Sequence, residues 1–296
     1  MIKRSLDQGA AFINGEIVPI NEAKIPISDW GFLRSDATYD VAHVWKNKFF
    51  RIDDHIERFF SSMERLHMDV GMTRAEIKQA MIDCFKATPF EDSYVEIICT
   101  RGQPVAGSRD PRTCQNQFWA FAIPFVYLLE PGKKGLSLII SERQRIPAAS
   151  LDPTIKNYQW LDMTLGLYEA YDRGAESVLL VDENGHLCEG PGFNIFVFTD
   201  GSLITPRSGV LRGITRRTIL ELGEGFGLDV CEADISKQMA VEADEIFVTS
   251  TAGGLIPVIM LDGTPVGDGE PGPMTRQLKQ AYWELHDDPR YSVLVD

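Results

Sequence analysis

The chain has 296 residues, of which 44% are hydrophobic and 24% charged, and its formal net charge is −14 at pH 7. This length allows two modest domains or one large one, with ample apolar material for a core. No run of about 18 apolar residues could span a bilayer. The acidic balance and the lack of basic patches argue against a nucleic-acid-binding surface, so we expect neither a membrane nor a nucleic acid as a partner.

The N-terminus and the cysteines set further limits. A basic pair, Lys3-Arg4, is followed by no apolar stretch, so we expect no secretory signal and a cytoplasmic location. The five cysteines are an odd number and show neither CxxC nor Cys/His spacing. We therefore expect reduced thiols, no disulfide framework and no metal site at Cys84, Cys99, Cys114, Cys188 and Cys231.

Strand patterns come first along the chain. Apolar residues on both sides of Asn14-Gly15 predict a hairpin over 11–19, because this dipeptide favours the tight turn that joins two strands. Residues 37–45 alternate and are rich in β-branched and aromatic side chains, which predicts a strand. Residues 49–52 are its expected hairpin partner.

Helical spacing begins after the second hairpin. Over 53–66, Ile56, Phe59 and Met63 fall on one face behind an aspartate that we expect to cap the helix. Residues 73–87 predict a second amphipathic helix.

The end of the first half indicates a domain boundary. Strands are expected over 93–102 and 117–129, on either side of a loop with prolines, glycines and arginines. Chain-breaking and charged residues over 130–135 predict a linker. We therefore expect one domain over 1–129 and another over 136–296.

The second half mixes strands and helices. A helix is expected over 160–172, ending before Gly174, and another over 216–222 with Thr215 as its cap. The amides that begin the second of these helices could hold a phosphate. Apolar runs between turn signals predict four strands, over 136–140, 177–181, 193–198 and 243–249.

A lysine and a glutamate bracket one helix and one strand of this half. Lys156 lies in an apolar and amide setting, and Glu189 precedes Gly-Pro-Gly, so the chain between them could return both to one site. A lysine that forms an imine with an aldehyde must be partly desolvated, and a buried carboxylate needs a cation to face. The protonated ring nitrogen of pyridoxal phosphate (PLP) would supply that cation.

Each of these features also has a purely structural interpretation. A single lysine is usually a solvated surface group, and a glutamate beside glycine is usually part of a turn. Thr215 could be a helix cap only, and Gly253-Gly254 a turn only. Arg58 could be a surface arginine paired with Asp54 one helical turn away.

The combination of these features is more specific. Lys156, Glu189, Gly213-Ile214-Thr215 and the Ser-Thr-Ala turn at 250–252 occur in an order that resembles the fold-type IV (class IV) PLP-dependent aminotransferases, over essentially the whole chain. The resemblance implies a two-domain fold of the α+β or α/β class, similar to the D-amino-acid aminotransferases, with a small N-terminal α/β domain and a larger, β-rich α/β C-terminal domain. It also implies a homodimer in which the partner's small domain completes each site.

The same resemblance implies roles for individual residues. Lys156 would form the Schiff base with PLP and move the proton during amino transfer, and Glu189 would keep the pyridine nitrogen protonated. Leu161 stands where many members carry a tyrosine that bonds the cofactor hydroxyl, so that role has no candidate. The implied phosphate-binding residues are Arg58, on a helix like the family's His-x-x-Arg helix, with Ile214, Thr215 and Thr251.

Two stretches carry the substrate prediction. The Ser-Asp-x-Thr-Tyr and His-Val pattern over 35–44 and the Lys-Asn-x-Gln-Trp pattern over 156–160 look most like the (R)-selective amine transaminases. The Arg-x-His of D-amino-acid members and the Phe-Glu-Gly-x-Arg of branched-chain members are not found at the matching positions. The expected pocket residues are Tyr39, His43, Trp160, Arg109, Thr251 and Ala252, with Arg109 meeting the keto-acid carboxylate and Arg34 and Arg101 as rivals for that role.

The predicted reaction is therefore amino transfer from an (R)-amine such as (R)-1-phenylethylamine to pyruvate. Branched-chain or D-amino-acid amino transfer is the first alternative. A β-elimination similar to that of the aminodeoxychorismate lyases is the second, because it would use the same lysine and glutamate. A PLP-free binding or scaffold protein is the third, and it is disfavoured because a fold needs neither a buried lysine nor its carboxylate partner.

Overall fold

The computed structural model describes residues 6–295, so the Lys3-Arg4 pair lies outside the described part. The chain divides into two compact units. The first unit contains Met1–Val126, Ile155–Gln159 and Asp288–Asp296, and the second contains Tyr127–Thr154 and Trp160–Asp287.

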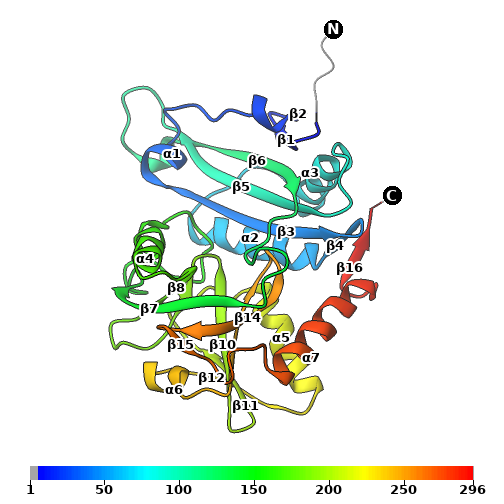
Figure 1. Cartoon of the computed structure of the whole chain (residues 1–296). Coiled ribbons are helices and arrows are strands. Elements are labelled where there is room, and N and C mark those ends of the chain that lie inside the picture. Colours follow the sequence, from blue (N-terminus) through cyan, green and yellow to red (C-terminus); the bar gives the residue numbers. More distant parts are fainter. Residues whose placement is uncertain (1–5, 296) are drawn as a thin grey trace. The chain divides into compact units, whose positions relative to one another are not determined.

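The first unit is built on a seven-stranded sheet in the order β16-β4-β3-β5-β6-β1-β2, in which all neighbours are antiparallel (Figure 1). The alternating pattern over 37–45 forms β3, as predicted, and Asn14 and Gly15 take positive φ in the predicted hairpin turn. The strand expected over 117–129 ends at Pro124. The strands are β1 (Ala10–Ile13), β2 (Glu16–Pro19), β3 (Ala37–Trp45), β4 (Lys48–Phe50), β5 (Ser93–Gln103), β6 (Gln115–Pro124) and β16 (Ser292–Leu294).

Helices α2 and α3 cover this sheet with apolar faces. Phe59 of α2 and Met81 of α3 share one core with Ile97 of β5, which explains the helical spacing in the sequence. The predicted aspartate cap of α2 is wrong: Arg51, in the left-handed conformation, precedes the helix and makes no side-chain cap. Thr73 caps α3 with a capping box. The helices are η1 (Ile20–Glu22), α1 (Trp30–Arg34), α2 (Ile52–Arg65), α3 (Arg74–Lys86) and η2 (Pro111–Thr113).

The second unit is built on a mixed nine-stranded sheet. Its main path is β12-β11-β10-β13-β14-β7-β8, with β9 paired to β10 and β15 to β14. The pairs β11–β12, β14–β7 and β7–β8 are parallel, and the other pairs are antiparallel. The strands are β7 (Leu136–Gln144), β8 (Ser177–Val181), β9 (Glu189–Gly190), β10 (Phe193–Thr199), β11 (Ser202–Pro206), β12 (Asp229–Ala233), β13 (Glu245–Ser250), β14 (Gly254–Leu261) and β15 (Thr264–Pro265).

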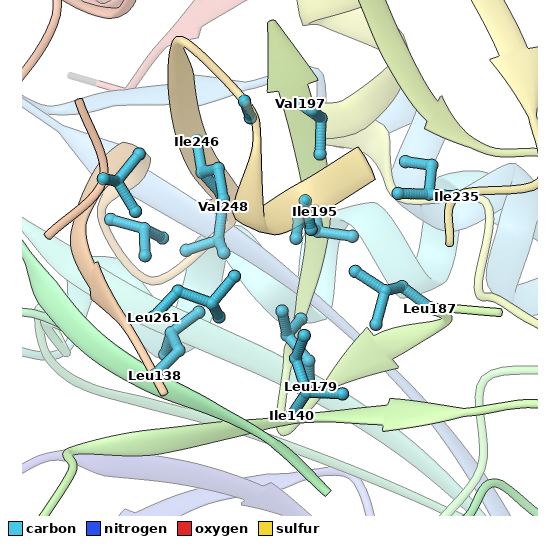
Figure 2. Packing of buried hydrophobic residues seen from close by; sticks show 14 of the residues in the cluster. Leu138, Ile140, Leu179, Leu187, Ile195, Val197, Ile235, Ile246, Val248 and Leu261 are labelled. Atoms are coloured by element: carbon cyan, nitrogen blue, oxygen red, sulfur yellow. The ribbon is translucent and has the colours of Figure 1, made fainter. Parts of the chain in front are cut away.

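A fully buried apolar cluster stabilises this sheet. Figure 2 shows side chains from β7, β8, β10 and β13 gathered in one interior, among them Leu138, Leu179, Ile195 and Val248. Burying a side chain of this size contributes roughly 1.5–3 kcal/mol. The apolar runs in the sequence therefore correspond to strands that are buried along their whole length.

The second unit also contains four α-helices and a short 3-10 helix among the described residues. The helix expected over 216–222 begins earlier, and its N-cap is Gly213. Thr215 lies inside the helix, so its predicted role as the cap is wrong. The helices are α4 (Leu161–Asp172), α5 (Ile214–Gly225), α6 (Lys237–Val241), α7 (Pro273–Glu284) and η3 (Leu285–Asp287).

The division of the chain differs from the expected 1–129 and 136–296 at three segments, the first of which is 127–129, now part of the second unit. Residues Ile155–Gln159 belong to the first unit because Asn157 forms an antiparallel bridge with Thr38 of β3. The C-terminal segment belongs there too, because β16 pairs with β4. Lys156 is thus part of the first unit. Within residues 6–295, none of the helices has the length and apolar character needed to cross a membrane.

Candidate active site

Both units carry predicted site residues. Within the first unit, Lys156 lies against Tyr39. Within the second, Glu189 is bonded to the loop that precedes α5. The first unit holds Lys156, Arg58, Tyr39, His43 and Arg109, and the second holds Glu189, Ile214, Thr215, Thr251, Ala252 and Trp160.

The backbone of Lys156 is fixed at the edge of β3. Its carbonyl oxygen accepts hydrogen bonds from the Thr38 hydroxyl at 2.6 Å and from the Tyr39 amide at 3.4 Å. Its own amide donates to the Ser62 hydroxyl of α2 at 3.3 Å. These contacts hold the lysine through atoms that every residue type possesses, which leaves the side chain available for chemistry.

The Lys156 side chain extends over an aromatic pair. Its Nζ lies 4.1 Å from the centroid of the Tyr39 ring, and Tyr39 stacks on Tyr158 with ring centroids 4.2 Å apart. The Tyr158 hydroxyl donates a hydrogen bond to Glu96 of β5. The lysine is thus half-buried beside two rings and one carboxyl group. Such surroundings reduce hydration of an ammonium group, which is a condition for a nucleophilic amine.

Glu96 is the most perturbed acid beside the lysine. Burial raises the pKa of Glu96 from 4.5 to about 7, although the Tyr158 hydroxyl and the Lys156 ammonium oppose this shift. Burial also raises the pKa of Tyr158 and of Tyr94, so both phenols stay neutral. Near neutral pH the carboxyl group of Glu96 can therefore bind or release one proton.

The raised pKa of Glu96 predicts how the stability of the folded chain depends on pH. The folded chain keeps a proton on Glu96 that the unfolded chain releases above about pH 4.5, so stability falls as pH rises from there to about 7. Glu96→Gln should remove this fall, which is a few kcal/mol at most at about 1.4 kcal/mol per pKa unit. Thermal unfolding of the apoprotein at about pH 5 and pH 8 measures it.

The matched control for that measurement is Glu224→Gln, which changes an exposed glutamate of α5. It should leave the difference between the two pH values as in the wild type. An equal loss of stability toward pH 8 in wild type and Glu96→Gln would contradict the assignment.

Arg58 is held by a buried carboxylate. Its Nε and Nη2 donate to the two carboxylate oxygens of Asp40 at 2.7 and 2.8 Å, and its side chain is only 12% exposed. His55 Nδ1 lies 2.7 Å from the same Asp40. Burial alone would raise the pKa of Asp40, but Arg58 and His55 outweigh it and hold that pKa below its usual range. Arg58 is therefore an oriented, mostly buried arginine and not a solvated surface group.

In the second unit, Glu189 is surrounded by hydrogen-bond donors. Its Oε2 accepts from the Leu211 amide at 2.9 Å and from Asn194 Nδ2 at 3.4 Å. Its Oε1 accepts from Arg145 Nη2 at 3.1 Å, and Arg145 also pairs with Asp162 of α4. The three charged side chains are 6 to 12% exposed and sum to one negative charge. This arrangement suits one additional positive charge at the glutamate.

The start of α5 has the properties of an anion site. Its N-cap is a glycine, which offers no side chain to the first-turn amides, and Ile214 and Thr215 are both buried. A Cβ at Gly213 would lie 2.2 Å from Asn194 Oδ1, so only glycine fits there. Asn194 also donates to the Leu211 carbonyl at 2.8 Å, which links this helix start to Glu189.

The turn between β13 and β14 is fixed on both sides. The Ser250 hydroxyl donates to the Gly192 carbonyl at 2.8 Å and accepts from the Ala252 amide at 3.1 Å. Gly254 has φ +72°, and a Cβ there would lie 2.5 Å from the Tyr282 ring. Thr251, inside this turn, therefore has a defined backbone position.

The other predicted pocket residues have varied surroundings. His43 is buried against the rings of Phe50 and Phe125. Trp160 is the N-cap of α4 and packs on a small apolar cluster under that helix. Leu161, for which the resemblance implied a tyrosine in many related enzymes, is 76% exposed.

The three candidate arginines also differ. Arg109 lies exposed on the loop after β5. Arg101 is buried, pairs with Asp36 through two hydrogen bonds and donates to two backbone carbonyls. Arg34 lies over the Trp30 ring at 3.3 Å. Arg34 and Arg109 are both exposed, and Arg109 is the one on a loop.

Four residues of these groups were not singled out from the sequence. Glu96 and Asp40 could have been noticed as charged residues inside otherwise apolar strands. Tyr158 stands in the lysine segment but its partner Glu96 is distant in sequence. Arg145 gives no local signal, because both of its partners are brought to it only by the fold.

Comparison with known proteins identifies the family of this chain. Residues 37–260, more than half of the chain, match the family model described as amino-transferase class IV. The chain is 30% identical to a putative branched-chain-amino-acid aminotransferase of Methanocaldococcus jannaschii, over 93% of this chain and 95% of the relative. It is 29% identical to a D-alanine aminotransferase of Staphylococcus haemolyticus, over 92% of this chain and 95% of that one.

Solved structures of branched-chain aminotransferases superpose on this chain over nearly its whole length. A branched-chain amino acid aminotransferase from Thermobaculum terrenum in its PLP form superposes with a TM-score of 0.87 at 29% identity, covering 99% of this chain and all of that one. A branched-chain amino acid aminotransferase from Escherichia coli superposes with a TM-score of 0.89 at 25% identity, covering 98% of this chain and all of that one.

Proposed function

The chain belongs to the class IV aminotransferases, PLP-dependent enzymes, and we propose that its preferred amino donor is an (R)-configured primary amine with an aromatic or branched apolar group. Pyruvate is the proposed acceptor. The observation that carries this proposal is the carboxyl group of Glu96 beside Lys156 and the stacked tyrosines.

The residues present fit PLP. When bound, this cofactor supplies an aldehyde and an electron-accepting ring. Lys156 would bind the aldehyde and move the proton of the donor carbon, and Glu189 would face the ring nitrogen. The single net negative charge of the Arg145, Asp162 and Glu189 side chains supports a protonated ring nitrogen there. The proposed phosphate-binding residues are Arg58, Ile214, Thr215 and Thr251.

Glu96 favours a donor that lacks a carboxylate. An amino acid whose carboxylate approached ionised Glu96 would meet a like charge in a poorly hydrated place, which is costly. A simple amine avoids that cost. Its apolar group would gain about 25 cal/mol per Å² when buried against rings such as Tyr39 and Tyr158. The carboxylate of the keto acid still needs a cation, and we propose Arg109 for it because its loop position leaves the guanidinium accessible.

The named relatives favour a second candidate, amino transfer between branched-chain L-amino acids and 2-oxoglutarate. Three of the four relatives named above are described as branched-chain aminotransferases, and their matches cover 93 to 99% of this chain. A branched apolar side chain would also gain from burial against aromatic rings. This candidate requires that Glu96 be protonated or turned away when the amino acid carboxylate binds.

A substrate panel decides between the two. We expect (R)-1-phenylethylamine with pyruvate to exceed D-alanine and L-leucine donors by about tenfold or more in kcat/KM, equivalent to about 1.4 kcal/mol in transition-state binding, with the (S)-amine inert. Purified protein should also show the visible absorption of bound PLP, bleached by the donor.

The panel has clear opposing results. If L-leucine with 2-oxoglutarate is the best pair by about tenfold, the branched-chain candidate replaces the amine. Pyruvate release without an amino acceptor would identify a lyase instead. Protein that cannot be reconstituted with PLP would contradict every one of these activities.

We also propose that the enzyme is a homodimer in which the first unit of one copy completes the site of the other. Sedimentation of the holoenzyme at equilibrium measures this state, and a monomer with full activity would contradict it.

A further inference from the structure

We propose that Arg145 is a positioning residue that keeps Glu189 ionised and in one orientation for the ring nitrogen of PLP. The inference rests on the proposed role of Glu189. It adds a residue that acts through this glutamate and that lies outside the predicted cofactor contacts.

The geometry of Arg145 supports this role. It directly follows β7, and its amide donates to the Val181 carbonyl at 2.9 Å, so its backbone is fixed. Its guanidinium lies between two carboxylates, donating to Glu189 Oε1 at 3.1 Å and to Asp162. Asp162 is itself held by the Ile146 amide at 3.1 Å. Asp162 therefore fixes one side of the guanidinium, and the other side donates to Glu189.

The charges around Glu189 explain why an arginine is needed. Asp162 on α4 shares Arg145 with Glu189, Cys188 adjoins Glu189 in the chain, and the neutral Asn194 of β10 donates to it. Asp182 and Glu183, which follow β8, act on the Cys188 thiol together with Glu189. Burial raises the pKa of the Cys188 thiol to about 12, so this group stays neutral.

Arg145 is the cation among these groups. Burial would lower the pKa of Arg145, but Glu189 and Asp162 more than offset this and raise it, so the charge is retained. Without Arg145, two carboxylates would remain buried near each other, and like-charge repulsion with desolvation would favour a proton on one of them. A protonated Glu189 would no longer attract a cationic ring nitrogen.

Three variants of the holoenzyme test this role: Arg145→Gln, Arg145→Lys and the double variant Arg145→Gln/Asp162→Asn. Arg145→Gln should raise the Kd for PLP about tenfold or more. It should also move the acidic limb of the pH profile, for both kcat and the visible PLP absorbance, up by about one pH unit or more. The lysine, which keeps the charge, should recover part of both effects. The double variant restores one net negative charge, so its acidic limb should return toward the wild-type position.

The double variant separates an electrostatic role from a structural one. If Arg145 only tied β7 to α4, removing Asp162 as well would not restore the acidic limb, and the inference would be overturned. The double variant also tests the inference if Arg145→Gln alone fails to fold, because it does not leave two buried carboxylates without a cation between them.

Two further variants serve as references. Arg207→Gln is the matched control, because Arg207 lines the same cavity as Arg145 but pairs with Asp234, and it should leave the Kd for PLP and both pH profiles unchanged. Glu189→Gln tests the underlying role. If it binds PLP with wild-type affinity and spectrum, the role of Glu189 itself is wrong. If Glu189→Gln is impaired while Arg145→Gln matches the wild type, only the inference about Arg145 is wrong.

Discussion

Replacing Lys156 with alanine is expected to lower the rate of amino transfer by about 10⁴-fold or more, because the chain loses both its nucleophilic amine and its proton carrier. The fold should persist, since the contacts of Lys156 with Thr38, Tyr39 and Ser62 use its backbone atoms. Single-turnover kinetics with the best donor measure the rate. The visible spectrum of protein mixed with PLP should lose the band of the bound cofactor.

The matched control is Lys279→Ala, because Lys279 is also half-buried but lies on α7 of the second unit. It should retain wild-type turnover and spectrum. Thermal unfolding of both apoproteins then separates a loss of chemistry from a loss of structure. An active Lys156→Ala enzyme would remove the lysine from its proposed role.

Strands were the best-predicted part of this fold. The pattern over 37–45 became β3 and the run over 177–181 became β8 with the expected bounds, because both are short segments whose alternation or uniform burial is visible locally. Helix starts were predicted less well. Arg51 and Gly213 precede α2 and α5 where an aspartate and Thr215 were expected, because backbone conformation at these positions is set by the neighbouring strand and loop.

The main candidate residues and the residues that support them differ in how well the sequence identifies them. Lys156 and Glu189 stand in distinctive local motifs, so the sequence singles them out. Their supporting residues do not, because each acts through a partner brought close by folding. Tyr158 hydrogen-bonds to Glu96 of β5, and Arg145, which directly follows β7, hydrogen-bonds to Glu189 of β9. Long-range pairs of this kind become visible only with the structure.

The second large effect is expected for Asp40→Asn, which weakens the buried partner of Arg58. Removing one charge of a buried pair costs about 3–5 kcal/mol, because the other is left uncompensated. The Arg58 guanidinium would also lose the two hydrogen bonds that orient it, so PLP affinity should fall by roughly tenfold or more. Urea unfolding of the apoprotein and PLP titration measure the two effects separately. Wild-type stability should fall with acid as the lowered pKa of Asp40 is crossed, since the stabilising form is the carboxylate.

Asp36→Asn is the matched control for this variant, because Asp36 also binds an arginine, Arg101, through two hydrogen bonds in the same unit. It should lose stability as well, to a smaller extent because Asp36 is 27% exposed, while its affinity for PLP stays near that of the wild type. A phosphate-binding role for Arg58 requires this contrast. If Asp40→Asn and Asp36→Asn lose PLP affinity equally, or if neither loses it, Asp40 stabilises the first unit without orienting Arg58 for the cofactor.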